Sequence, residues 1–353
     1  MNCNAFCLSQ RIINFNLKVA LEKILNVQLI ASQWNQATLP INLGGIGIRS
    51  AYELSSPAYL ASVHSTHNLI LAVLGHSNSV VYDENFQDAI EIWKEKSEGE
   101  ALGDLYSGNQ FFWSNALSTK RHQILLDSLS QPTDIARILA LSLPESNCWL
   151  QALPIQSMGT FLDNDSLRIS IALRLGAPIV KSHNCVCGSY VNISGTHGLC
   201  CQKSAGRRFR HDSINDILKR ALVSAKIPSI LEPQGTCRDD GKRPDGLTMV
   251  PWRQGKCMIW DVTCVDVDTL APSHVELTSN LAGSAANEAE KKKCAKYSSL
   301  SNQFIFVPVG FETFGPWGYE ASKLVTEIGK RLTEVTGEKQ ATSDLKQRIS
   351  MAI

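Results

Sequence analysis

Hydrophobic residues recur at helical spacing through the first half of the chain. They return every three or four positions in the runs that begin at Leu17 and at Ile124. This period places apolar side chains on one face of an α-helix. The sequence therefore predicts a helical domain over residues 1–180. Within it, the charged stretch 83–100 is expected to form a solvated helix or a linker.

After Pro178 the pattern changes to short apolar runs separated by turns. A helix is expected first, followed by three strands, a second helix, a buried strand and a final helix. This αβββαβα order predicts an α/β domain with a central mixed sheet over residues 212–353. The fold class is thus a helical half followed by an α/β domain. In chain order, the expected elements cover residues 213–225, 229–231, 246–250, 257–265, 281–300, 304–309 and about 320–334.

Composition and charge narrow the class of protein. Hydrophobic residues make up 44% of the chain and charged residues 19%, as in ordinary soluble globular proteins. No apolar run approaches the roughly 18 residues of a membrane span, and no signal peptide is expected, so no membrane partner is predicted. The net charge of +1 hides an asymmetry. Residues 1–180 hold 11 Lys and Arg against 15 Asp and Glu, whereas residues 181–353 hold 23 Lys and Arg against 18 Asp and Glu. The basic half is where a polyanionic partner is expected.

Four clustered residues suggest a zinc site. The chain has 11 cysteines. Without a secretory signal they indicate a reducing, intracellular compartment, where clustered cysteines bind metal. Cys185 and Cys187 offer two thiolates from one turn, and His197 and Cys201 offer two more ligands from a second turn, as tetrahedral zinc requires. The sequence predicts a structural zinc knuckle over residues 183–211.

The pattern leaves some ligands open. The Cys-x-Cys spacing is tighter than the usual gap of two to four residues. Cys200 competes with Cys201, and His183 or His211 could also substitute. The alternative is a loop of thiols that bind no metal.

A basic segment follows the cysteine cluster. Residues 203–226 hold seven Lys and Arg against two Asp. Phosphate contacts from such a segment are independent of sequence and sensitive to salt. The alternative is an ordinary solvated surface. The expected nucleic-acid-binding residues are Lys203, Arg207, Arg208, Arg210, Lys219 and Arg220.

Two aspartates stand at expected strands. Asp245 follows Arg243 and Pro244 just before one strand, and Asp261 lies inside the next, between Trp260 and a valine. A carboxylate in such an apolar strand is costly to bury unless it is paired or binds a cation. Two acids at adjacent strand ends predict a Mg²⁺ site, because this ion prefers oxygen ligands.

The helix that follows carries lysines toward these acids. Ala286, Lys293 and Tyr297 lie on one stripe of the expected helix, with Lys296 beside it. A lysine there can activate a metal-bound water and offset the charge of a phosphate. The alternative is a structural salt bridge between Lys293 and Asp261.

Together these motifs resemble the C-terminal region of non-LTR retrotransposons that carry a restriction-like endonuclease of the PD-(D/E)xK type. In that family a CCHC knuckle precedes a K/R-P-D motif, a second strand aspartate and a K-x-x-K-Y helix. Upstream, residues 34–40 and 44–49 resemble the thumb segment after the reverse-transcriptase palm. The matching residues are Cys185, Cys187, His197 and Cys201, then Arg243-Pro244-Asp245, then Asp261, and finally Lys293, Lys296 and Tyr297.

The resemblance implies a Mg²⁺-dependent endonuclease that nicks target DNA in the nucleus, with a structural Zn²⁺. Element RNA is a second candidate partner, and no small-molecule substrate is expected. Thr263 stands where a lysine is expected after the second acid, which leaves Lys293, ranked first, and Lys296 as candidates. No Tyr/Phe-x-Asp-Asp turn is present, so no polymerase activity is predicted. The alternative function is a non-catalytic nucleic-acid-binding remnant of a truncated element.

Overall fold

The computed structural model describes residues 3–74, 84–97, 109–201, 203–234, 243–264 and 269–353. They form two compact units, Met1–Leu129 and Ser130–Ile353. This division differs from the boundary expected at residue 180. The helices at Pro132–Leu141 and Cys148–Gln151 group with the sheet unit, because they contact helices late in the chain. Among the described residues no helix has the length and apolar character needed to cross a bilayer.

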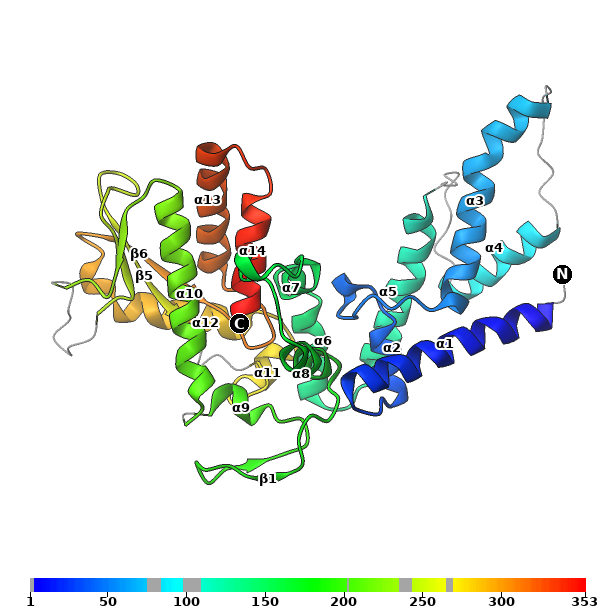
Figure 1. The fold of residues 1–353 in the computed structure, drawn as a ribbon, viewed down its shortest axis with the longest axis horizontal. Coiled ribbons are helices and arrows are strands. Elements are labelled where there is room, and N and C mark those ends of the chain that lie inside the picture. The colour runs from blue at the N-terminus through cyan, green and yellow to red at the C-terminus, as the bar shows by residue number, and fades with distance from the viewer. Residues whose placement is uncertain (1–2, 75–83, 98–108, 202, 235–242, 265–268) are drawn as a thin grey trace. The chain divides into compact units, whose positions relative to one another are not determined.

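Helices make up the first unit where it is described. Phe86, Ile90 and Trp93 are buried in its core, and the Trp93 indole donates a hydrogen bond to the Trp113 carbonyl at 2.8 Å. The stretch 83–100 therefore contains a helix that packs, rather than only a solvated one. The helices are α1 (Cys3–Leu25), α2 (Ala31–Ala37), α3 (Ala51–Leu74), α4 (Glu84–Ser97) and α5 (Gln110–Ser128), with a 3-10 turn at Ile41–Leu43 (Figure 1).

A four-stranded mixed sheet lies at the centre of the second unit, with strand order β3-β4-β5-β6. The first two pairings are antiparallel and the last is parallel. The strands are β3 (Ser229–Leu231), β4 (Gly246–Thr248), β5 (Met258–Thr263) and β6 (Ile305–Gly310). The fold is thus mixed helix and sheet, as expected at the level of class. Two helices, at Val275–Thr278 and Ala341–Ala352, are added to the expected αβββαβα order.

Helices cover both faces of this sheet (Figure 1). Trp260 and Val262 of β5 are buried against α10 (Ala205–Ser224), α13 (Tyr319–Thr336) and α14 (Ala341–Ala352). Because side chains alternate along a strand, Asp261 faces the other side, which α12 (Ser284–Lys296) covers. Helix α10 begins eight residues before the expected start, so it overlaps the expected knuckle. Helix α14 was not expected.

The remaining elements of the second unit are short. The knuckle segment contains a two-stranded hairpin and one helical turn. In chain order they are α6 (Pro132–Leu141), α7 (Cys148–Gln151), α8 (Asn164–Leu175), β1 (His183–Asn184), β2 (Tyr190–Val191), α9 (His197–Cys200) and α11 (Val275–Thr278), with 3-10 turns at Glu145–Asn147, Gln156–Met158 and Ser298–Leu300.

Strand β6 forms one edge of the sheet. The amide groups of Ile305 and Phe311 donate to the carbonyls of β5 and its flanks, each at 2.9 Å. Successive amide groups of a strand point alternately to its two neighbours. Those of the even-numbered residues of β6 therefore point away from β5, to the open edge of the sheet. Pro308 has no amide hydrogen there, and the Gly310 amide donates to the Glu290 carboxylate at 3.2 Å.

Two buried glutamates stabilise helix starts in this unit. Glu290 accepts hydrogen bonds from the amides of Glu320 and Ala321 in the first turn of α13, at 3.0 and 2.9 Å. Glu312 accepts from the Ala286 amide of α12 at 3.1 Å and from the Thr269 hydroxyl at 2.9 Å. Burial raises the pKa of both carboxyl groups, although these hydrogen bonds act in the opposite direction.

We expect Glu312→Gln to weaken the pH dependence of stability. A raised pKa in the folded state means that folded protein holds the proton more tightly than the unfolded chain does. The free energy of unfolding therefore falls as the pH rises from the unfolded pKa through the raised one. Urea unfolding at pH 5 and pH 8 should show a smaller loss of stability in the variant than in wild type. An equal or larger loss in the variant would contradict the assignment.

Candidate functional site

Asp261 is the centre of a buried polar cluster. Its side chain lies inside β5 and the residue is only 3% exposed. The Lys293 ammonium contacts Oδ1, and the Tyr297 hydroxyl donates to Oδ2 at 2.5 Å. Lys293 belongs to α12, which covers this face of the sheet, and Tyr297 is the residue that ends it. The cluster therefore brings together three of the five residues that the sequence suggested for catalysis.

Asp245 immediately precedes β4 and lies beside Asp261. Its amide donates to the Trp260 carbonyl at 2.9 Å, and its Oδ2 accepts from the Val262 amide at 2.6 Å. Because residues 260 and 262 flank Asp261, Asp245 lies beside Asp261, although the Asp245 carboxylate contacts α10 and the Asp261 carboxylate contacts α12. The Tyr297 hydroxyl also donates to the Arg243 carbonyl at 3.0 Å, so the residue that ends α12 contacts the segment before β4 as well as β5.

His211 of α10 also holds Asp245, with Nε2 3.0 Å from Oδ2. This hydrogen bond is the main reason that the pKa of His211 is raised to about 9, against a smaller opposing effect of burial. For Asp245, burial raises the pKa, but the hydrogen bond and charge of His211 outweigh it and the pKa falls below its usual value. The sequence did not assign this role to His211, which lies 34 residues before its partner.

A second layer fixes the geometry behind Asp245. A side chain at Gly246 would overlap the Trp260 ring, so only glycine leaves room for the indole there. The Trp260 indole donates to Asn215 Oδ1 at 3.0 Å, and Asn215 lies one turn after His211 on α10. A glycine directly after Asp245 could have indicated this close contact with a large side chain. Nothing in the sequence indicated that Asn215 accepts from Trp260.

The two candidate lysines differ in their contacts. Lys293 contacts the Asp261 carboxylate, whereas the Lys296 ammonium lies 3.3 Å from the Tyr297 hydroxyl. Lys293 is thus the helix lysine at the acid, as ranked first from the sequence. Thr263, at the position where the PD-(D/E)xK pattern has a lysine, is buried in β5. The ion pair between Lys293 and Asp261 is also the structural alternative considered above.

We expect Lys293→Met to lower the free energy of unfolding by about 3 kcal/mol, because it leaves a buried carboxylate without its cation. The double variant Asp261→Asn with Lys293→Met should recover most of that loss, since no charge remains. Lys292→Met on the exposed side of α12 is the matched control, and a surface pair is worth about 0.5 kcal/mol. Urea unfolding measures all four chains. A double variant as unstable as Lys293→Met would show that charge burial is not the cause.

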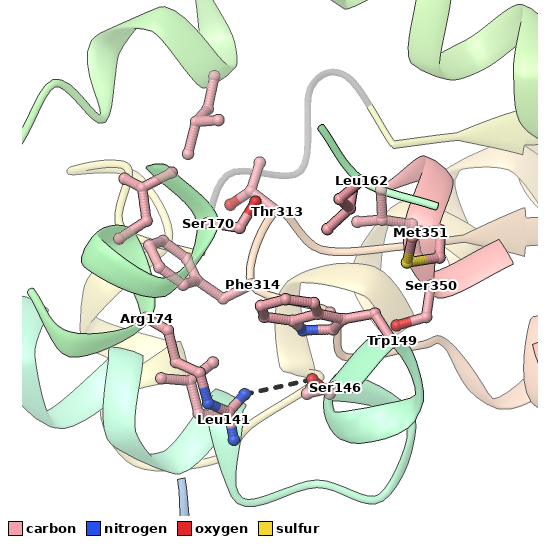
Figure 2. A pocket seen from close by; sticks show the side chains of 14 residues that line it. Leu141, Ser146, Trp149, Leu162, Ser170, Arg174, Thr313, Phe314, Ser350 and Met351 are labelled. Carbon is pink, nitrogen blue, oxygen red and sulfur yellow. Dashed lines mark hydrogen bonds between the residues drawn. The ribbon is translucent and has the colours of Figure 1, made fainter. Parts of the chain in front are cut away.

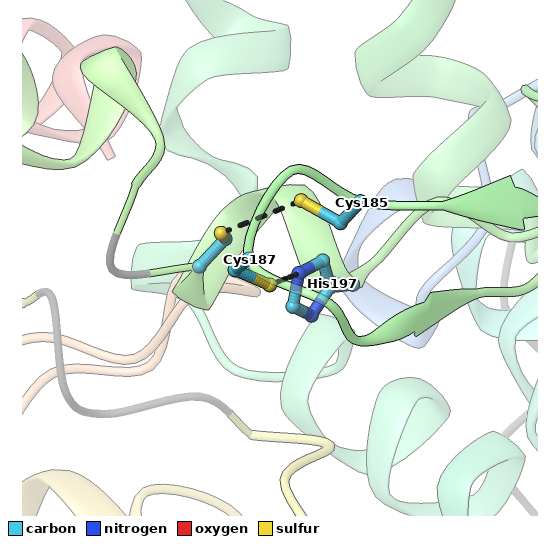
Figure 3. A group of neighbouring side chains, drawn as sticks. Cys185, Cys187 and His197 are labelled. Carbon is cyan, nitrogen blue, oxygen red and sulfur yellow. Dashed lines mark hydrogen bonds between the residues drawn. The ribbon is translucent and has the colours of Figure 1, made fainter.

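The four predicted zinc ligands meet in the knuckle (Figure 3). Their ligand atoms all lie within 4.8 Å of one another. The Cys185 and Cys201 sulfurs are 3.7 Å apart, and Cys187 Sγ is 3.2 Å from His197 Nε2. A tetrahedral zinc ion with Zn–S bonds of about 2.3 Å holds its sulfurs about 3.8 Å apart. The residues therefore form a group that could bind a metal such as zinc.

Local structure brings these four ligands together. The other candidate ligands, Cys200, His183 and His211, make other contacts. The Gly188 amide donates to the Cys185 carbonyl at 2.8 Å and closes the first turn. Hydrogen bonds from the side chain and backbone of Ser189 lower the pKa of Cys187 to about 6, which favours the metal-binding thiolate. Cys200 instead points to the His197 carbonyl, at 3.6 Å. His183 Nδ1 lies 2.8 Å from the Lys181 carbonyl, and His211 pairs with Asp245.

The expected nucleic-acid-binding residues have mixed surroundings. Arg210 donates to the Leu199 carbonyl and so links α10 to the knuckle. Lys203 donates to the Val186 carbonyl at 3.1 Å. Arg208 and Arg220 are exposed and form ion pairs with aspartates one turn away, at 3.8 and 2.8 Å. Lys219 is half-buried, and the Arg207 side chain lies outside the described residues.

The second unit also contains an apolar cavity of about 160 Å³ (Figure 2), which Leu199 of the knuckle borders on one side. Trp149, Phe314 and Arg174 line it. The Arg174 guanidinium donates to the Ser146 carbonyl at 3.3 Å and to Asn147 Oδ1 at 2.5 Å. Its lining contains no carboxylate, cysteine or histidine. Arg174 therefore serves to tie α8 to the 3-10 turn, and the cavity adds nothing to the acid cluster.

Comparison with known proteins adds no assignment to this geometry. No protein-family model matches the chain. No curated protein matches it either. The residues of the chain and the resemblance of its motifs are therefore the basis for a functional proposal.

Proposed function

We propose that the chain is a metal-dependent DNA endonuclease of the restriction-like type carried by non-LTR retrotransposons. The observation that supports it most is that Lys293 and Tyr297 both contact Asp261, with Asp245 just before the adjacent strand. Two strand acids with a lysine supplied from the following helix are the set that the motif resemblance implies. The mixed sheet agrees with the fold type that accompanies it. A DNA partner and a nuclear location follow from this proposal.

In this proposal Asp245 and Asp261 hold Mg²⁺, which when bound makes a water more acidic and stabilises charge on the phosphate. The donor set fits the ion, because both ligands are carboxylates and Mg²⁺ keeps several waters. The reaction is hydrolysis of a phosphodiester. The water oxygen forms a bond to phosphorus, one ester P–O bond breaks, and the leaving oxygen takes up a proton.

The protein residues have separate tasks in this reaction. Lys293 and Tyr297 engage both oxygens of Asp261, so coordination through Oδ1 requires the ammonium group to move. A lysine released in this way can approach a phosphate oxygen and offset its charge. Tyr297 keeps the hydrogen bond to Oδ2 and holds the carboxylate in place. The zinc knuckle and the exposed Arg208 would contact the DNA backbone.

A competing proposal is a non-catalytic nucleic-acid-binding remnant. The ion pair between Lys293 and Asp261 favours it, because that pair satisfies the buried acid without a metal ion. The knuckle and the exposed arginines of α10 would be sufficient for binding. This proposal requires DNA or RNA affinity but no cleavage.

A plasmid assay separates the two proposals. Binding to supercoiled DNA is measured in Ca²⁺, and nicking of the same DNA is measured in Mg²⁺. The endonuclease proposal expects conversion to open circles in Mg²⁺ but not in Ca²⁺. Saturated binding without any nicking would support the remnant instead.

A further inference from the structure

His211 occupies a position that the proposed reaction has not used. It lies on α10, and its side chain is 29% exposed. Its Nε2 lies 3.0 Å from Oδ2 of Asp245, across the gap between helix and strand. The contact joins the element that follows the knuckle to the strand that carries the first acid. It is not a zinc ligand, because the knuckle ligands are four other residues.

Oδ2 of Asp245 receives a second donor, the Val262 amide, at 2.6 Å. Two donors on one oxygen fix the plane of the carboxylate. They also occupy the oxygen that they contact, so a cation would use the other oxygen, Oδ1. The Val262 amide belongs to the backbone of β5 and cannot be lost by substitution of a side chain. His211 is thus, with Asn215, one of two side chains that donate hydrogen bonds to Asp245 and orient it.

The orientation of the imidazole is itself set by neighbours. The groups that face it are the acids Asp245 and Asp212, with Asp212 Oδ1 3.3 Å from Nδ1, and the amide of Asn215. Because Asn215 Oδ1 accepts from the Trp260 indole, its NH₂ group is the side that lies near the ring, 3.4 Å from Nε2. The same NH₂ group donates to the His211 carbonyl at 3.3 Å and to the Asp245 carboxylate, so Asn215 links His211 to Asp245.

We propose that His211 is a positioning residue that orients Asp245 for coordination of a divalent cation. This inference rests on the proposed function. Residues that hydrogen-bond to metal ligands fix ligand geometry, and their loss typically lowers metal affinity about 10-fold to 100-fold. His211 would act through Asp245 and would not contact the substrate.

The test measures cation affinity as well as cleavage in the full, zinc-loaded chain. Mn²⁺ binding is followed by electron paramagnetic resonance, with Asp245→Asn defining the signal that belongs to this site. We expect His211→Ala to weaken Mn²⁺ binding about 10-fold to 100-fold and to raise the Mg²⁺ concentration for half-maximal nicking by a similar factor. His211→Gln, which can place an amide N–H near Nε2, should recover most of both. His67→Ala, in the first unit, is the control for loss of a histidine.

Two results would overturn the inference in different ways. A folded His211→Ala that binds Mn²⁺ and responds to Mg²⁺ as wild type does would reject this role while leaving the endonuclease proposal intact. A wild-type chain that neither binds Mn²⁺ through Asp245 nor nicks DNA would reject both. If His211→Ala does not fold, His211→Leu takes its place, because it removes the hydrogen-bond donor but keeps more of the side-chain volume. The comparison of its Mn²⁺ affinity with that of His211→Gln then tests the same role.

Discussion

Asp245→Asn is expected to reduce the rate of plasmid nicking about 1,000-fold, an effect of roughly 4 kcal/mol on the barrier. The amide is neutral and is a much weaker ligand for Mg²⁺ than a carboxylate. Its carbonyl oxygen can still accept from the Val262 amide, which now binds Oδ2 at 2.6 Å. The fold should therefore persist, and DNA binding in Ca²⁺ should stay within about twofold of wild type.

The control for this variant is Asp88→Asn, which removes an exposed carboxylate from α4 in the first unit. Asp88→Asn changes the net charge of the chain by the same amount as Asp245→Asn, but it leaves the acid cluster unchanged. Equal nicking by Asp88→Asn and wild type would show that the loss in Asp245→Asn is local. Nicking by Asp245→Asn at the wild-type rate would mean that any cation acts elsewhere, and the endonuclease assignment to this site would be wrong.

Cys201→Ser is expected to abolish zinc binding, with a loss of affinity of at least about 1,000-fold. The hydroxyl is a poor ligand for zinc, and three remaining ligands cannot complete the tetrahedron. Metal analysis of the purified chain should find one zinc per wild-type molecule and none in the variant. Hydrogen exchange should accelerate in the hairpin and in α9, since a short segment with little core depends on its metal for order.

Cys200→Ser provides a matched control at the adjacent position. The Cys200 thiol contacts the His197 carbonyl rather than the ligand group, so this variant should retain its zinc. Loss of zinc in Cys200→Ser and retention in Cys201→Ser would exchange the roles of the two cysteines. Retention of zinc in both would indicate that another residue completes the site.

The candidate site was visible in the sequence where local pattern sets geometry. Asp261 interrupts an apolar strand, and strand alternation alone places it on the face opposite Trp260. Helical spacing places Lys293 and Tyr297 on one stripe, and both contact Asp261. The four knuckle residues lie within 17 positions of one another, so short turns are enough to bring their ligand atoms together.

What the sequence did not indicate depends on contacts between distant segments. The bond from His211 to Asp245 joins α10 to β4, and no local period describes it. The first turns of α10 are basic and lack an apolar stripe. Their helical form is instead supported by the Arg210 contact to the knuckle. Helix α14 has only Leu345 and Ile349 buried in a polar segment, which is too weak a pattern to recognise.

The two compact units divide the chain at residue 129, whereas the sequence predicted a change of character near residue 180. Helix α6 has an ordinary helical pattern that resembles those of the N-terminal helices, and α7 is too short to show one. Their partners, α11 and α14, come more than 120 residues later. Periodicity identifies which face of a helix is buried, but not which element buries it.

The outer edge of β6 has a consequence for assembly. Strand addition by a second molecule needs a row of available amide and carbonyl groups. Along this edge Pro308 offers no amide hydrogen, and the amide of Gly310 already binds Glu290. An incoming strand would lose two successive rungs of its ladder, so protomers cannot join their sheets here into a continuous one, and this border also resists fibril growth.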